Sequence, residues 1–380
     1  MNRLEKSKRS PYMEWAKTRS TARFNLATSG LTSVSMAQFP LQVADLEITG
    51  GGYGYGPLLE RIAAHTGAPV ECIVTAEGTS MANHLAMAAL LGPNDEVVIE
   101  QPTYGLLLDV VHYLGAQVRR VPRRFEEGFA ISLGEIAAAI TPRTRLIVLT
   151  NLHNPTGALI PIETLHALGE LAERVGAHVL VDEVYLEMLF ARPDWTRRGE
   201  SLRRDELPLV QDASSFSLGE NFVVTSSLTK AYGLSGLRCG WILAAPELAR
   251  RIWRLNDLFA ATAAHPAERM SVMAFNHLAR FRERARALLS TNRALLDSFL
   301  DSRVDLECVR PPAGSVVFPR LTNDDTEGFF KLLREKYETS VVPGEFFEAP
   351  RHFRLGIGGE TGNLREGLER LGAALDEFGR

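Results

Sequence analysis

Cysteine and long apolar runs are both scarce in this sequence. The three cysteines, Cys72, Cys239 and Cys308, stand far apart, with neither a CxxC motif nor a cluster of metal-ligand spacing. No stretch approaches about eighteen uninterrupted apolar residues, and no apolar run follows the basic residues at the N-terminus. The sequence therefore predicts a protein of the reducing cytoplasm, without a disulfide framework, a metal site or a membrane anchor.

An excess of positive charge is also missing. The formal net charge is −4, and the arginine pairs at 119–120, 123–124 and 197–198 do not extend into longer basic runs. A nucleic-acid ligand would normally require a basic face, so we expect no nucleic acid as partner. With 45% hydrophobic and 23% charged residues, the 380-residue chain has the composition of an ordinary globular protein.

Short apolar segments alternate with amphipathic ones from about residue 57 to about residue 250. This alternation is typical of a mostly parallel sheet with helices on its faces, the α/β class. Pro57 and Pro161 stand where first helical residues are expected, Ser132 and Glu135 form a capping-box pattern, and glycines 92, 115 and 176 follow expected helices. The expected strands are Cys72–Thr75, Glu96–Ile99, Gln117–Val121, Arg145–Leu149, His178–Val181, Phe222–Thr225 and Gly240–Ala244.

The pattern changes after about residue 260. Long arginine-rich helical stretches are followed by short strands at Ser315–Phe318 and His352–Ile357 and by a final helix, Asn363–Phe378. We expect a large domain at 46–262 and a smaller α+β domain at 263–380. The segment 1–45, which contains a capped helix at Ser10, is too short to fold alone and should lie against the smaller domain.

Lysine is rare, and one lysine is isolated. The chain has six lysines against thirty-six arginines, and Lys230 has no other lysine within ninety residues of it on either side. Arginine stays protonated and cannot form an imine, so a lysine kept in an arginine-rich chain suggests imine chemistry. A surface lysine without a function is the alternative, and isolation alone does not decide between the two.

The segment around this lysine, SSLTKAYGLSGLRCG at 226–240, is rich in hydroxyls and glycines and follows an expected strand. Ser227, Thr229 and Arg238 could bind phosphate oxygens. The segment resembles the cofactor-lysine motif of class I/II aminotransferases, the fold type I enzymes related to aspartate aminotransferase. The resemblance implies that Lys230 holds pyridoxal 5′-phosphate (PLP) as a Schiff base. It also implies a seven-stranded PLP-transferase sheet, with a small domain built from both termini.

A second match lies at the end of the expected strand His178–Val181. An acid at the carboxyl end of a parallel strand lies in the crevice where ligands bind. By resemblance, Asp182 pairs with the pyridine nitrogen and Tyr185 hydrogen-bonds the ring oxygen of the cofactor. An apolar strand ending in Asp-Glu is also typical of a Walker B element. The sequence contains no Gly-Lys pair, which excludes a P-loop partner for such an element.

Further matches follow the order of the family. By itself Asn154-Pro155-Thr156-Gly157 predicts only a turn, but its resemblance to the HNPTG segment makes Asn154 a second donor to the ring oxygen and a contact of the substrate. The resemblance implies the remaining roles as well. They are phosphate binding at a helix N-terminus by Gly78, Thr79 and Ser80, ring stacking by Tyr104, substrate carboxylate binding by Arg354, and a closing loop at Gly30.

The glycine-rich run at 50–57 lacks the preceding strand and the spacing of a dinucleotide fingerprint. In the family a tyrosine before the following helix reaches the phosphate of the partner subunit. Tyr53 and Tyr55 both qualify, and either choice implies a homodimer with shared active sites. The polar stretch between Met188 and Asn221 is a lid or an exposed insertion.

The resemblance implies an aminotransferase that moves the amino group of an L-amino acid to a 2-oxo acid. No arginine can be assigned to a second, distal carboxylate of the substrate. A lyase or an oxidase on the same scaffold is an alternative, because these reactions begin with the same proton abstraction. A non-catalytic sensor with an aminotransferase-like domain is a more distant one.

Overall fold

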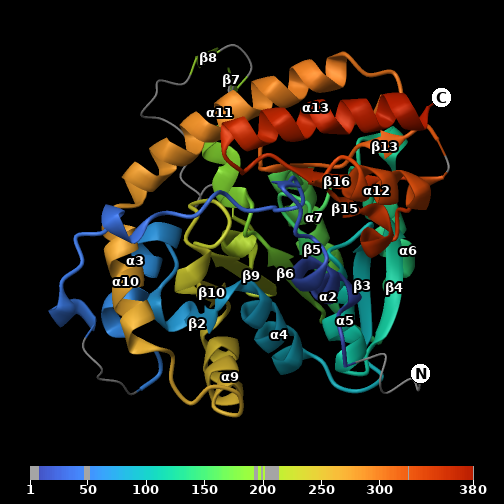
Figure 1. Ribbon diagram of the computed structural model, residues 1–380. Coiled ribbons are helices and arrows are strands. Elements are labelled where there is room, and N and C mark those ends of the chain that lie inside the picture. The colour runs from blue at the N-terminus through green and yellow to red at the C-terminus, as the bar shows by residue number, and fades with distance from the viewer. Residues whose placement is uncertain are drawn as a thin grey trace.

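A seven-stranded sheet forms the centre of the computed structural model, which describes residues 8–46, 52–191, 196–197, 200–201, 214–323 and 325–379 (Figure 1). The strand order is β2-β10-β9-β6-β5-β3-β4. Only β10 runs antiparallel to its neighbours. The strands are β2 (Ile73–Glu77), β3 (Glu96–Gln101), β4 (Gln117–Pro122), β5 (Thr144–Thr150), β6 (His178–Asp182), β9 (Phe222–Ser227) and β10 (Cys239–Leu243). The predicted mostly parallel sheet is confirmed.

Helices cover both faces of this sheet. One apolar core joins one sheet face to α4 (Gly78–Leu90), α5 (Gly105–Tyr113) and α9 (Pro246–Asn256). A second core joins the other face to α6 (Leu133–Ala139) and α7 (Ile162–Glu173). Strands buried on both faces consist of nearly continuous apolar residues, which is why the sequence located them well.

The predicted helix boundaries hold within two residues, and the final helix starts at Thr361 rather than at Asn363. The Ser132 hydroxyl caps α6 by accepting a hydrogen bond from the backbone of Glu135, and Pro57 lies in the first turn of α3 (Gly56–Thr66). The sequence pattern places Pro161 as the first helical residue of α7. In the structure it is the residue before this helix. Its fixed φ suits the extended conformation that a capping position requires.

The C-terminal part combines long helices with short strands. Helices α11 (Leu278–Asp301) and α13 (Thr361–Phe378) cross the top of the view in Figure 1, beside α12 (Thr326–Glu335). Strands β12 (Val316–Val317), β16 (Phe353–Gly356) and β15 (Val342–Pro343) form one small sheet, and β11 (Leu306–Glu307) pairs with β13 (Arg320–Leu321).

The N-terminal segment joins this C-terminal part. Strand β1 (Phe24–Asn25) pairs in parallel with β14 (Thr339–Ser340). Helix α2 (Pro11–Thr18) precedes β1, and the Ser10 hydroxyl accepts the backbone N–H of Met13 at its start. Because β1 is bound to β14, α2 is held close to the carboxyl edge of the central sheet. The domain boundaries at 45/46 and 262/263 stay a prediction.

The remaining elements are short, apart from α10 (His265–Asn276), which lies against α3. Strands β7 (Thr196–Arg197) and β8 (Glu200–Ser201) form a separate pair. The stretch between Met188 and Asn221, where we expected a lid or an insertion, lies partly outside the described residues. The 3₁₀ helices are η1 (Met36–Gln38), η2 (Val43–Leu46), η3 (Val70–Cys72), η4 (Phe125–Glu127), η5 (Leu186–Ala191), η6 (Ser215–Leu218), η7 (Ser235–Leu237) and η8 (Gly344–Phe347). Within the described ranges no helix has the length and apolarity that crossing a membrane requires.

Candidate active site

A cavity of about 300 Å³ lies at the carboxyl ends of the parallel strands. Three segments distant in sequence enclose it, namely the N-terminal helix α2, the strand ends of the central sheet, and β16 of the C-terminal part. The sequence-predicted residues that line it are Thr79, Ser80, Tyr104, Asn154, Asp182, Tyr185, Thr229, Lys230, Arg238 and Arg354. The fold therefore brings most of the predicted site together.

Lys230 lies in the loop after β9, and its amine reaches the cavity. Its Nζ donates a hydrogen bond to the Oγ of Ser29 at 3.1 Å. The backbone of Leu31 donates to the carbonyl of Lys230 at 3.0 Å, so the two loops run close together. A Cβ atom on Gly30 would lie 3.4 Å from Cδ of Lys230, so Gly30 lies directly against this side chain. Burial lowers the pKa of the Lys230 amine, which favours the neutral, nucleophilic form.

Asp182 is the last residue of β6 and is buried. Its Oδ2 accepts a hydrogen bond from Nδ2 of Asn83 at 2.8 Å, and its Oδ1 accepts the backbone N–H of Val184 at 3.1 Å. Burial raises the pKa of Asp182 to about 6, although both hydrogen bonds oppose this shift. A buried carboxylate with neutral donors is well suited to receive a cationic N–H group from a ligand.

Asn83 is a site residue that the sequence reasoning missed. Its Nδ2 donates to Asp182, while its Oδ1 accepts the hydroxyl of Thr225 at 2.6 Å. The two bonds fix the orientation of the amide and hold the acid in place. Asn83 follows Thr79 by four residues on α4, so helical spacing could have indicated that both lie on the same face.

Hydroxyl groups gather at the N-terminus of α4. The Oγ1 of Thr79 donates to the Oγ of Ser227 at 2.7 Å, and Ser227 lies 2.7 Å from the hydroxyl of Thr229. Ser227 thus lies beneath the cavity and orients the two threonines. The positive end of the helix dipole adds to this environment, which suits an anion such as phosphate.

Arg238 covers the same helix terminus. Its guanidinium donates to the carbonyl oxygens of Glu77 at 3.1 Å and Ser235 at 3.3 Å. A Cβ atom on Gly78 would lie only 2.2 Å from this guanidinium, and Gly78 has a φ of +72°. The positive φ favours glycine at 78, and the close guanidinium would have to move for any larger residue.

Arg354 lies at the other end of the cavity and is almost fully buried. Its Nη1 donates to Oδ1 of Asn154 at 2.9 Å, and its Nη2 donates to the phenol oxygen of Tyr12 at 2.9 Å and to the carbonyl of Ala27 at 3.2 Å. Its Nε is buried without a partner among the described residues. An unpaired buried N–H is costly and indicates a place for a ligand acceptor.

Tyr12 is the second residue that the sequence reasoning missed. Its ring meets that of Tyr104 edge to face, with centroids 5.5 Å apart, and its hydroxyl accepts from Arg354. Only a capped helix could be predicted at this position, because nothing local shows where that helix docks. Tyr185 also lines the cavity and is buried, and burial raises the pKa of its phenol.

Tyr53 and Tyr55 do not line this cavity in the same chain. They line a second cavity of about 710 Å³, which shares Arg238 with the first. The hydroxyl of Tyr53 donates to Oδ2 of Asp257 at 3.0 Å, and the ring of Tyr55 contacts His265 edge to face. Both tyrosines line this second cavity together with Arg238.

Comparison with known proteins identifies the family. The sequence model for aminotransferase class I and II matches residues 42–371. The chain belongs to this family. Arginine–pyruvate transaminase of Pseudomonas aeruginosa is 30% identical, with 84% of this chain and 79% of that protein covered. Capreomycidine synthase of Streptomyces vinaceus is 28% identical, with 97% of this chain and 94% of that protein covered.

Solved structures agree with this assignment. A PLP-dependent aminotransferase of Streptococcus suis superposes with a TM-score of 0.85 at 27% identity, covering 98% of this chain and 99% of that chain. The PLP-dependent cyclase OrfR gives a TM-score of 0.82 at 25% identity, with 98% of each chain covered. The protein is a PLP-dependent aminotransferase with the fold type I architecture, as its sequence predicted.

The site residues fit this cofactor. Asp182 offers a buried acceptor for the pyridine N–H, and the hydroxyls at the α4 terminus with Arg238 offer donors for the phosphate. Lys230 supplies the only lysine amine among the residues that line the cavity. The three features surround one space of suitable polarity, and Arg354, whose Nε is buried without a partner among the described residues, lines the same cavity.

Proposed function

We propose that this aminotransferase uses Lys230 both to hold PLP and to move the proton at the substrate α-carbon. The observation that carries this proposal is the position of its amine in one cavity with Asp182 and Arg354. Bound PLP would supply an electron sink for negative charge at that carbon. Burial lowers the pKa of the Lys230 amine, which makes the neutral amine that can accept a proton easier to form.

The other residues would orient the cofactor. Asp182 would keep the ring nitrogen protonated, and Tyr185 and Asn154 would donate to the ring oxygen. Tyr104, which lies in the wall of the cavity, would stack on the ring. Phosphate binding falls to the residues around the α4 terminus and the lysine loop, which are Gly78, Thr79, Ser80, Ser227, Thr229 and Arg238.

Arg354 would bind the α-carboxylate that an amino acid and a 2-oxo acid share. Asn154 would orient the guanidinium of Arg354 through their hydrogen bond. The loop at Gly30 would close over the carboxylate of the substrate. Among the described residues that line the cavity, Lys230, Arg238 and Arg354 are the cations, and all three have roles already. We therefore infer that the substrate has no second carboxylate that this chain recognises.

A cyclisation or elimination reaction is the second candidate. Capreomycidine synthase matches a larger share of this chain, 97%, than the transaminase of Pseudomonas aeruginosa, 84%. Both reaction classes begin with removal of the α-proton, and Lys230 could perform that step in either. They differ in the fate of the amino group: transamination leaves it on the cofactor, elimination releases it as ammonia, and cyclisation keeps it in the product.

A homodimer with shared sites is part of the proposal. Tyr53, Leu258 and Phe259 are 55%, 78% and 50% exposed, and Tyr53 and Phe259 both line the cavity beside Arg238. An exposed apolar surface next to a binding site suggests a protein interface. We infer that Tyr53 is the tyrosine that reaches the partner's phosphate site, because Tyr55 caps α3 and contacts the core.

We also propose a cytoplasmic location. All three cysteines are free, and Cys72 and Cys239 are buried, as is usual for a protein that does not depend on oxidation. Cell fractionation of a tagged chain in its source organism would test this.

A single-turnover experiment tests the reaction. The PLP-loaded enzyme is mixed with one L-amino acid at a time, and the cofactor spectrum, the 2-oxo acid and ammonia are measured together. An aminotransferase converts one equivalent of cofactor to its aminated form and releases one equivalent of 2-oxo acid. Ammonia with pyruvate, or an unchanged cofactor with a cyclised product, would overturn the transaminase proposal.

A further inference from the structure

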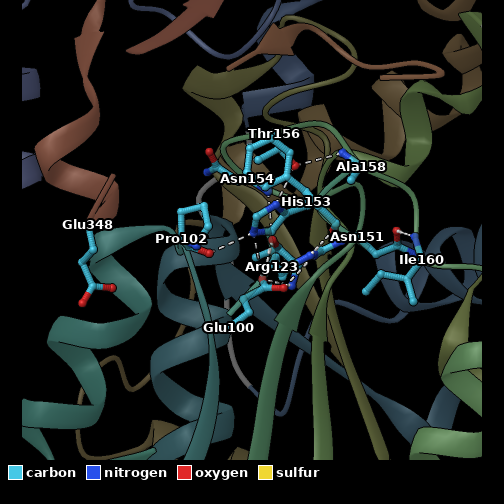
Figure 2. Close-up of polar contacts among 12 residues, drawn as sticks. Glu100, Pro102, Arg123, Asn151, His153, Asn154, Thr156, Ala158, Ile160 and Glu348 are labelled. Carbon is cyan, nitrogen blue, oxygen red and sulfur yellow. Dashed lines mark hydrogen bonds and ion pairs between the residues drawn. The ribbon is translucent and has the colours of Figure 1, made fainter. Parts of the chain in front are cut away.

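A buried ion pair lies beneath the site at the ends of β3 and β4. Glu100 and Arg123 both have fully buried side chains, and Nη1 of Arg123 donates to Oε2 of Glu100 at 2.7 Å. The Nε of Arg123 donates to the carbonyl of Phe129 at 2.6 Å. Figure 2 shows this pair directly below the turn that contains Asn154. The transamination mechanism gives these two residues no role.

Glu100 also forms two hydrogen bonds with Thr150, the last residue of β5. Its Oε1 accepts the backbone N–H of Thr150 at 2.8 Å and the Thr150 hydroxyl at 2.9 Å. A carboxylate that pairs with arginine only accepts hydrogen bonds, so the Thr150 hydroxyl must donate its hydrogen to it. A lone pair of that hydroxyl is then free to accept the backbone N–H of Asn154, which lies 2.9 Å away.

The same turn is also fixed by His153, whose Nε2 lies 3.6 Å from Oε1 of Glu100. Its Nε2 lies 3.0 Å from the carbonyl of Pro102, which only accepts, so Nε2 carries the hydrogen. Its Nδ1 must then accept the hydroxyl of Thr156 at 2.7 Å. Burial and the nearby Arg123 hold the pKa of His153 well below its usual value, in agreement with a neutral ring.

The chain of bonds ends at the substrate arginine. Asn154 Oδ1 accepts a hydrogen bond from Arg354 Nη1. A displacement of Asn154 would therefore also change the position of Arg354. Each bond in the series has a fixed direction, from the Thr150 hydroxyl to Glu100 and from the Asn154 backbone to Thr150.

We propose that Glu100 is a positioning residue, which fixes the direction of the Thr150 hydrogen bond and thereby holds Asn154 against the cofactor ring and Arg354. The inference rests on the proposed role of Asn154. That role has its own test, because Asn154→Ala should change the spectrum of the bound cofactor. An unchanged spectrum in that variant would refute the role of Asn154 and not the bonding of Glu100.

The chain offers a matched control for Glu100. Glu96 lies on the same strand, is equally buried, and accepts from Arg119 at 2.8 Å and from Arg143. It lies at the amino end of β3, away from the cavity. Glu100→Gln and Glu96→Gln therefore each remove a buried carboxylate that binds arginine from the same strand, although the arginine partners of Glu96 are more exposed than Arg123, and both should lower thermal stability.

The two variants should differ in the properties of the site. In the PLP-loaded dimer, Glu100→Gln should raise KM for the amino donor about tenfold, as expected for one weakened hydrogen bond to a charged group. It should also move the pH midpoint of the cofactor's visible absorbance upward, because a displaced Asn154 stabilises the ring oxygen less. Glu96→Gln should leave both unchanged. Equal values of KM and of the midpoint in the two variants would overturn the proposal.

Thr150 provides an independent test that keeps the ion pair. Thr150→Val removes the hydroxyl, whereas Thr150→Ser retains it. We expect the valine variant to shift the absorbance midpoint and KM as Glu100→Gln does, and the serine variant to restore both. If Glu100→Gln does not fold, this pair decides the matter, and a valine variant with the wild-type midpoint would refute the relay.

Discussion

Lys230 donates a hydrogen bond from Nζ to Oγ of Ser29 at 3.1 Å, although 201 residues separate them. Ser29 belongs to the N-terminal segment, which β1 joins to β14 in the C-terminal part. The amine that chemistry requires is therefore contacted by a segment fixed to a different part of the chain. Movement of that segment would change the surroundings of Lys230 directly.

Replacing Lys230 should abolish both cofactor attachment and turnover. Lys230→Ala removes the only lysine amine among the described residues that line the cavity, so the enzyme should show no lysine imine absorbance. Absorption spectra and a transamination assay measure this. Lys331→Ala, on α12, should behave as the wild type. Normal transamination by Lys230→Ala would refute its assignment.

Asp182 should make the cofactor-free protein less stable above about pH 6. Its pKa is raised by burial from 3.8 to about 6. Between these values the unfolded chain loses its proton first, so unfolding becomes easier as pH rises, by about 3 kcal/mol in total. Below the unfolded pKa both states are protonated and the effect disappears.

The variant Asp182→Asn separates this effect from other titrations. The unfolding free energy of the wild type should fall relative to that of the variant between about pH 4 and pH 6.5, and then remain parallel to it. Denaturant unfolding of the two cofactor-free proteins at several pH values measures the difference. A difference that does not change with pH would show that the pKa of Asp182 is the same in the folded and unfolded chains.

Tyr12 should contribute to substrate binding and not to cofactor binding. Tyr12→Phe removes the acceptor of the Arg354 bond, and loss of a hydrogen bond to a charged group should raise KM for the amino acid by about tenfold or more. The dissociation constant of PLP should stay the same. Tyr337→Phe is the control, because that hydroxyl bonds to Glu377 on the surface. A weaker affinity for PLP would contradict the placement of Tyr12 at the substrate end.

Arg238 should act on the phosphate alone. Arg238→Gln removes a charged donor beside the α4 terminus, so we expect the dissociation constant of PLP to rise about tenfold or more. Pyridoxal without its phosphate should bind the variant and the wild type equally. Arg250→Gln, which removes an exposed partner of Glu247, should change neither value. An equal loss of pyridoxal affinity would place Arg238 at the ring instead.

Much of the central sheet could be predicted because its strands are buried on both faces. Such strands are marked by continuous apolar runs, and an acid at the end of such a strand marks the binding edge, as Asp182 does. A predicted helix boundary can differ from the observed one where a residue suits two neighbouring positions equally well. Pro161, for example, suits both a capping position and a first helical position.

The partners of the site residues could not be predicted. Asn83 and Tyr12 stand in helices that the sequence locates, but their side chains matter only because of what approaches them. Asp182 meets Asn83 from a strand 99 residues away, and Arg354 meets Tyr12 from 342 residues away. No periodicity within a segment carries information on which other segment it will contact.

The sequence by itself determined the chemistry of this protein: an isolated lysine in a hydroxyl-rich loop, an acid at a strand end, and the order of strands and helices that places both in an α/β sheet. Only the tertiary structure decided the hydrogen-bond directions that prepare the site, from Glu100 through Thr150 to Asn154 and Arg354. The physical reason is that local patterning fixes which residues are buried. The direction of a buried hydrogen bond depends on which donors and acceptors surround it, and these come from the whole chain.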